Sequence, residues 1–122
     1  MKSKFVHINI VAKNWKKLAE FYINVFGCKI KLPERNLSGE WLDNLTGIEK
    51  AVIKGAHLIL PEFEEAGPTI EIFEYNNNIE NSEKLINKTG FAHIAFAVEN
   101  VEYALTLVIK HGGSAISGPV KT

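Results

Sequence analysis

Hydrophobic and polar positions along this chain change period in a fixed order that begins near the N-terminus. Residues 5–11 are apolar at nearly every position and rich in β-branched side chains, a pattern typical of a strand buried on both faces. From Trp15, apolar residues recur at the i, i+3, i+4, i+7 spacing of an amphipathic helix. Asn14 stands at the cap position and Gly27 where such a helix ends. The pattern therefore predicts a strand followed by a helix of about twelve residues.

The same pattern returns 86 positions later, so that residues 7–30 align with residues 93–116 without a gap. The first histidine and the cap asparagine of each copy coincide, as the pairs His7 and His93, Asn14 and Asn100. The second copy predicts a strand over 91–98, a helix over 101–111 and a short strand near 115–116. An internal repeat of this kind indicates two related modules, each opening with a histidine on a strand.

The residues between the copies predict three further strands and a short helix. A strand over 28–32 is expected to end at Pro33, and a polar stretch follows with a helix from Gly39 to Thr46, capped by Ser38. Two more strands, 51–60 and 68–75, flank an acidic loop. In the second of these, alternation places Thr69, Glu71, Phe73 and Tyr75 on one face.

We therefore predict a single α+β domain over residues 1–122, built from two tandem βαβββ modules whose sheets line one cleft. Module one spans 4–76, a polar connection 77–89, and module two 90–122. The second module is incomplete by comparison with the first, which leaves an open sheet edge. We expect about 15–30 further residues in the native chain, or a partner chain that covers that edge.

The amino-acid composition limits the kinds of molecule that this protein is expected to bind. The 14 basic and 14 acidic side chains cancel, which argues against electrostatic capture of nucleic acid or of an anionic membrane. There is no apolar stretch of signal-peptide or membrane-spanning length, so we expect a cytoplasmic protein. The one cysteine, Cys28, excludes an internal disulfide and is interpreted as a small buried hydrophobe.

Three polar residues in apolar strands could carry chemistry: His7, Glu71 and His93. Buried polar side chains need partners, and two imidazoles with a carboxylate are sufficient to bind a divalent metal. A single strand histidine is more often a satisfied core residue, but two at equivalent repeat positions favour a shared site. His57 has no counterpart in the repeat, so we interpret it as packed or hydrogen-bonded.

Four other side chains are candidates for a substrate pocket. Asn9 shares a strand face with His7, while Phe73 and Tyr75 share one with Glu71. Trp41 is unusual in its polar stretch and has two readings, a plug over the end of a sheet or a lid over a pocket.

The motifs resemble the vicinal oxygen chelate superfamily, which includes glyoxalase I, methylmalonyl-CoA epimerase, extradiol dioxygenases and the bleomycin resistance proteins. The resemblance is carried by His-Ile-Asn-Ile at 7–10, Phe-Tyr at 21–22, Ile-Glu-Ile at 70–72 and Ala-His-Ile-Ala-Phe at 92–96. It implies that curved sheets enclose a metal, with His7 as first ligand, Glu71 as second and His93 as third. A fourth ligand, usually a glutamate, would come from beyond Thr122.

The chain departs from bacterial glyoxalase I at two places. Where that enzyme has an arginine four residues past the first ligand, this chain has Val11, and an asparagine four residues past the second ligand is replaced by Tyr75. These differences argue against glutathione adducts as substrates.

The resemblance implies a glyoxalase-like lyase or isomerase that acts next to a carbonyl through a metal-stabilised enediolate, with Glu71 as ligand and candidate base. Nickel, zinc, cobalt, manganese and iron all accept these ligands. One alternative is an extradiol-type dioxygenase, since two histidines and a carboxylate also suit ferrous iron. Another is a metal-free small-molecule binding or resistance protein. We expect a homodimer, with the metal site either within one chain or across two.

Overall fold

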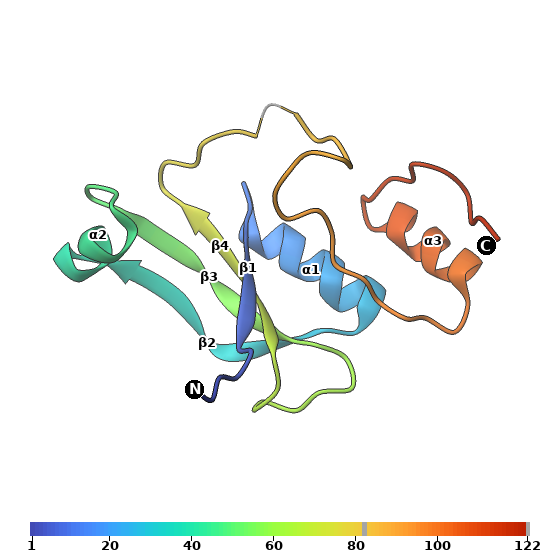
Figure 1. Ribbon diagram of the computed structural model, residues 1–122, viewed down its shortest axis with the longest axis horizontal. Helices are drawn as coiled ribbons and strands as arrows, with labels where there is room; N and C mark the ends of the chain where they lie inside the picture. Colours follow the sequence, from blue (N-terminus) through green and yellow to red (C-terminus); the bar gives the residue numbers. More distant parts are fainter. Residues whose placement is uncertain (82, 122) are drawn as a thin grey trace.

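The computed structural model describes residues 1–81 and 83–121 and has an α+β fold (Figure 1). Its elements are β1 (His7–Val11), α1 (Trp15–Phe26), β2 (Lys29–Ser38), α2 (Glu40–Thr46), β3 (Val52–Ile59), β4 (Thr69–Tyr75) and α3 (Val101–Lys110). The sheet order is β1-β4-β3-β2. β1 runs parallel to β4 and the other pairs are antiparallel, so antiparallel neighbours dominate as predicted. In the part of the chain described, no helix is long and apolar enough to cross a membrane.

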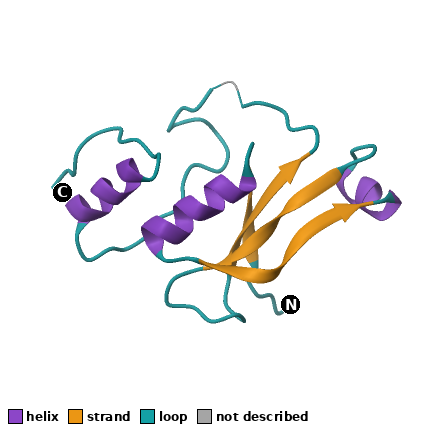
Figure 2. Ribbon diagram, turned by 180° about the vertical axis from the view of Figure 1, so that it is seen from behind, coloured by secondary structure: helices purple, strands orange, loops and turns teal. Residues whose placement is uncertain are grey.

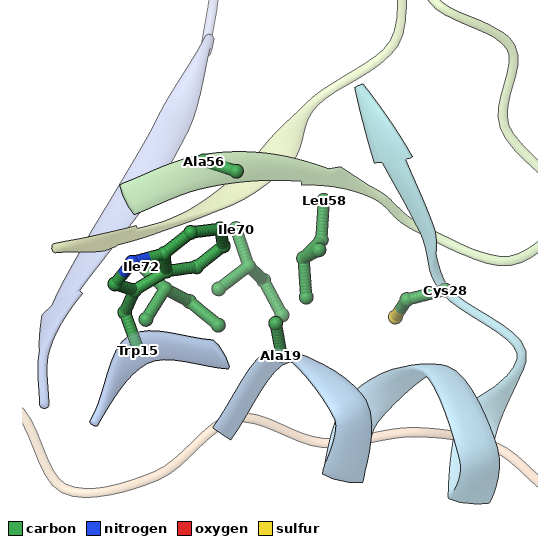
Figure 3. Packing of buried hydrophobic residues seen from close by; sticks show 7 residues of the cluster. All are labelled: Trp15, Ala19, Cys28, Ala56, Leu58, Ile70 and Ile72. Atoms are coloured by element: carbon green, nitrogen blue, oxygen red, sulfur yellow. The ribbon is translucent and has the colours of Figure 1, made fainter. Parts of the chain in front are cut away.

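Helix α1 covers one face of the sheet and forms the main core with it. The Asn14 side chain accepts the backbone N–H of Lys17, and Gly27 ends the helix with a φ of 76°, which confirms both predicted caps. The buried residues on this face are Trp15, Ala19, Cys28, Ala56, Leu58, Ile70 and Ile72 (Figure 3). Each large aliphatic side chain buried here stabilises the fold by about 1.5–3 kcal/mol. Cys28 is a buried small hydrophobe, as expected.

Helix α2 packs on the opposite face, at one end of the sheet. Leu42 forms a second buried cluster with Ala51 and Ile53, and Phe73 and Tyr75 pack against it. Ile53 and Phe73 alternate with the residues that face α1, which places α2 on the other side of the sheet. Figure 2 shows α2 and α3 at opposite ends of the molecule. Apart from α2, no helix among the described residues covers this face of the sheet, which we call the open face.

The predicted end of β2 and the predicted cap of α2 were wrong. β2 continues through Pro33 to Ser38, with a shift of register between Lys31 and Arg35. Proline is tolerated there because β2 is an edge strand and the irregularity removes the need for its missing N–H. Ser38 is therefore the last residue of the strand, and Gly39 occupies the cap position without a side-chain hydrogen bond.

The prediction that residues 5–11 are buried on both faces was also wrong. β1 is the other edge strand, and only alternate residues are half-buried, namely Ile8 and Ile10. Phe5 lies before the strand and is exposed. The opposite face of β1 is open to solvent, which leaves His7 and Asn9 accessible.

The second copy of the repeat forms its helix but not its strands. α3 matches the predicted helix, and Asn100 accepts the backbone N–H of Tyr103 as Asn14 does for Lys17. Residues 91–98 and 115–116 are not strands, because no neighbouring strand among the described residues hydrogen-bonds with them. The 91–98 segment is held instead by Phe96, whose ring stacks on Phe26 with centroids 4.1 Å apart. The described residues therefore form one sheet rather than two sheets lining a cleft.

The main core generates a stability prediction. Leu58 is fully buried between the sheet and α1, so Leu58→Ala should lower the free energy of unfolding by about 2–5 kcal/mol. Leu45 is 75% exposed on α2, so Leu45→Ala should change the free energy of unfolding by less than about 0.5 kcal/mol. Urea unfolding followed by circular dichroism measures both, and equal effects would contradict the assigned core.

Candidate metal centre

Three potential metal ligands converge on the open face of the sheet: His7 from β1, His57 from β3 and Glu71 from β4. β4 lies between β1 and β3, and His57 is the direct cross-strand partner of Glu71. The carboxylate therefore stands between the two imidazoles. The hydrophobic alternation that buries Ile70 and Ile72 against α1 is what turns Glu71 to this face.

The distances within the cluster fit a small cation. His57 Nε2 lies 2.8 Å from one carboxylate oxygen of Glu71, and His7 Nε2 lies 3.3 Å from the other. One ligand atom from each residue can be chosen so that all three lie within 4.8 Å of one another. Atoms this close can converge on one divalent ion through bonds of about 2.0–2.2 Å. Two imidazoles and one carboxylate are also a common donor set for such ions.

Neighbouring polar groups orient two of the three ligands. Nδ1 of His57 lies 2.7 Å from the hydroxyl of Thr69, which is buried. This contact leaves Nε2 directed at the cluster, in the way that metal-binding histidines are usually held. Asn9 donates its side-chain N–H to Glu71 Oε1 at 3.0 Å. Asn9 was predicted to line a substrate pocket, and that role stays a prediction; in the structure Asn9 holds the carboxylate.

The electrostatics of the cluster favour a neutral His57. Burial lowers the pKa of His57 below its ordinary value of 6.5, against the opposing effect of the Glu71 carboxylate. Interaction with His7 and the positive charges of Arg35 and Lys31 lower this pKa further. A neutral imidazole is the form that binds a metal.

His57 is the site residue that sequence reasoning missed. The feature of the sequence that could have identified His57 is the hairpin of β3 and β4. This hairpin is symmetric about residue 64, and residue 64 lies seven residues after His57 and seven before Glu71. Two strand residues equidistant from the centre of a hairpin face each other on the same side of the sheet. Counting from the acidic loop would therefore have paired His57 with Glu71.

His93 does not join this cluster. It is exposed on the irregular segment 91–98, and the group of ligands found among the described residues does not include it. As a ligand contributed by a second copy of the chain, His93 stays a prediction.

The predicted aromatic pocket residues lie toward the α2 end of the open face. Phe73 and Tyr75 are half-buried, with ring centroids 6.5 Å apart, and pack against the cluster centred on Leu42. Trp41 is 55% exposed on α2. The site that these three residues could form lies on the same sheet face as the candidate metal ligands, since Phe73 and Tyr75 alternate with Ile72 as Glu71 does.

A cavity of about 380 Å³ opens beside the cluster, at the end of the sheet away from α2. His7, His57 and Thr69 form its wall toward the cluster. A small molecule in this cavity would therefore lie next to two of the three candidate ligands, His7 and His57.

Comparison with known proteins identifies the family and the fold. The family model for the Glyoxalase/Bleomycin resistance protein/Dioxygenase superfamily matches residues 4–122. Among solved structures, the chain is similar to a glyoxalase family protein from Bacillus cereus, with a TM-score of 0.84 and 18% identity over 100% of this chain and 80% of that one. No curated protein sequence matches the chain. The predicted resemblance and the glyoxalase-like α+β fold are confirmed; at this identity the structural likeness concerns the fold alone.

The pKa of His57 gives a pH-dependent prediction for the metal-free protein. Because the folded-state pKa lies below 6.5, protonation favours the unfolded chain, and stability should fall as the pH drops below about 6.5 through the folded pKa. In the Glu71→Gln variant the pKa of His57 should fall further, because the negative charge that raises this pKa is removed. Glu74 lies on the opposite face and accepts the N–H of Trp15, so Glu74→Gln should leave it unchanged. Histidine NMR titration measures this; a higher pKa in Glu71→Gln would refute the assignment.

Proposed function

Because the chain belongs to the Glyoxalase/Bleomycin resistance protein/Dioxygenase superfamily, we propose that it is a metal-dependent lyase or isomerase that moves a proton next to a carbonyl group of a small substrate. The observation that carries the proposal is the convergence of His7, His57 and Glu71 on an open sheet face beside a cavity. This set of donors combines metal ligands with a group that accepts protons.

The proposed ligands are His7, His57 and Glu71. Their donor set accepts nickel, zinc, cobalt, manganese or ferrous iron, which is the same set of metals that the sequence leaves open. Such an ion, when bound, supplies a Lewis acid that stabilises negative charge on substrate oxygens. Thr69 fixes the ring of His57 and Asn9 fixes the carboxylate, so little side-chain freedom would be lost on binding.

Glu71 is the proposed catalytic base. One oxygen of its carboxylate faces His57 and the other faces His7 and Asn9, so the group stands at the centre of the cluster. A carboxylate there can take a proton from the carbon beside the substrate carbonyl and return it to a neighbouring atom. The N–H of Asn9 holds Glu71 Oε1 in place, which limits the carboxylate rotations that compete with transfer.

The aromatic residues at the α2 end are the proposed walls for the rest of the substrate. Phe73 and Tyr75 present ring surface on the same face as Glu71, and Trp41 stands on the helix above that end. A homodimer remains part of the proposal, with the exposed segment that carries His93 as its candidate contact.

A second function is supported by the donor set itself. Two histidines and one carboxylate with open positions also suit ferrous iron in oxygen-dependent ring cleavage. His57 supplies the second histidine within one chain, so this extradiol-type alternative does not depend on His93.

The proposed reaction predicts exchange of carbon-bound hydrogen with solvent. In deuterium oxide, the protein loaded with divalent metal should exchange the hydrogens beside the carbonyl of hydroxyacetone, and a chelator should abolish this exchange. Glu71→Gln should slow the exchange roughly 100-fold or more, because it removes the proposed base and weakens one of the proposed metal ligands. Glu74→Gln, a change of the same chemistry on the opposite face of β4, should exchange like the wild type. Proton NMR follows the loss of signal.

Other outcomes separate the alternatives. Oxygen consumption by the iron-loaded protein with a catechol, without hydrogen exchange, would favour the dioxygenase. Tight ligand binding that a chelator leaves unchanged would favour a metal-free binding protein. Equal exchange in Glu71→Gln and the wild type would rule out Glu71 as the base.

A further inference from the structure

The cavity beside the metal ligands has an unusual balance of charge. Three cationic side chains, Lys4, Lys31 and Arg35, line it, and the one carboxylate among its lining residues is that of Glu65, which is exposed. The chain as a whole carries no net charge, so positive charge is concentrated at this place. Arg35 is also the only arginine in the sequence.

The sheet register turns two of these cations toward the metal ligands. Lys31 is the cross-strand partner of His57, and Arg35 is the partner of Gly55 on the same face of β3. Directly opposed residues in an antiparallel pair lie about 4.5–5.5 Å apart at Cβ. The row across the open face therefore runs from Asn9 through Glu71 and His57 to Lys31, and the side chain of His7 reaches this row at Glu71.

Among the described residues, these cations have no anionic partner of their own. Within residues 1–81 and 83–121, no ion pair involves Lys4, Lys31 or Arg35. Lys31 donates from Nζ to the backbone carbonyl of Glu65 at 2.8 Å, which holds it at the cavity wall without neutralising it. Lys31 and Arg35 are both half-buried. Charges partly removed from water without a partner are costly, and a bound anion would offset that cost.

We propose that Lys31 and Arg35, with Lys4 at the rim, bind an anionic oxygen group of the substrate, a carboxylate or a phosphate. The guanidinium of Arg35 suits such a group because it donates two parallel hydrogen bonds. With its anionic group held there, the substrate would span the distance between β2 and β3, and its reacting part would lie at the proposed metal ligands. The placement of that reacting part rests on the proposed function, whereas the anion site rests on β2 and the cavity alone.

Three hydroxyketones that differ in charge test this site. Hydroxyacetone is neutral, hydroxypyruvate carries a carboxylate and dihydroxyacetone phosphate carries a phosphate. Calorimetry should show that at least one anionic compound binds roughly tenfold or more tightly than hydroxyacetone, as expected for hydrogen bonds to a charged group. The tighter of the two identifies the anionic group. Arg35→Met and Lys31→Met should each reduce this preference severalfold, because each should weaken binding of the anionic compound more than binding of hydroxyacetone.

Lys54→Met is the matched control, because Lys54 is exposed on β3 and faces the other side of the sheet. It removes the same charge and should keep the full preference. Thermal unfolding of each variant checks that the fold is retained. The anion site is overturned if neither anionic compound binds more tightly than hydroxyacetone, or if the preference survives in both Arg35→Met and Lys31→Met.

Repeating the titrations with chelator separates this proposal from the reaction. If chelator leaves hydroxyacetone binding unchanged while the Arg35-dependent preference remains, the metal-dependent function fails and the anion site stands. If hydroxyacetone binding depends on metal but no variant alters the preference, the anion site fails and the function stands.

Discussion

The pairing of β3 with β4 is the constraint on which the rest of the site depends. It sets His57 opposite Glu71, and the same register sets Ala56 and Leu58 beside Ile72 and Ile70 on the face that packs against α1. A slip of one residue would turn the apolar set to solvent and the polar set into the core. The hydrophobic effect on one face therefore fixes the position of the proposed metal ligands on the other.

Most of the first module could be predicted from sequence because its signals are local. The α1 boundaries follow from apolar spacing and from Asn14 and Gly27, and the structure confirms both caps. Alternation in residues 68–75 correctly placed Glu71 on a different face from Ile70 and Ile72. Two of the three clustered residues, His7 and Glu71, were among the candidates that the sequence named, His7 because it opens the first copy of the repeat.

The features that could not be predicted from the sequence depend on contacts with residues that are distant along the chain. Residues 91–98 have the composition of a strand, but a strand needs a neighbour for its backbone groups, and composition carries no information about one. The repeat therefore led to His93, whereas the cluster uses His57, whose role depends on hairpin register. β2 likewise passes through Pro33 because it lies at an edge, which only the sheet order reveals.

The central claim is that one chain holds the ion through His7, His57 and Glu71. The metal content of single-residue variants tests this claim most directly. The wild type and the variants His57→Ala and His93→Ala would be purified without chelator, equilibrated with zinc and analysed by mass spectrometry for metal per chain. The account predicts about one ion per wild-type chain, a similar value for His93→Ala and a large loss in His57→Ala. Wild-type metal content in His57→Ala, together with its loss in His93→Ala, would contradict the account.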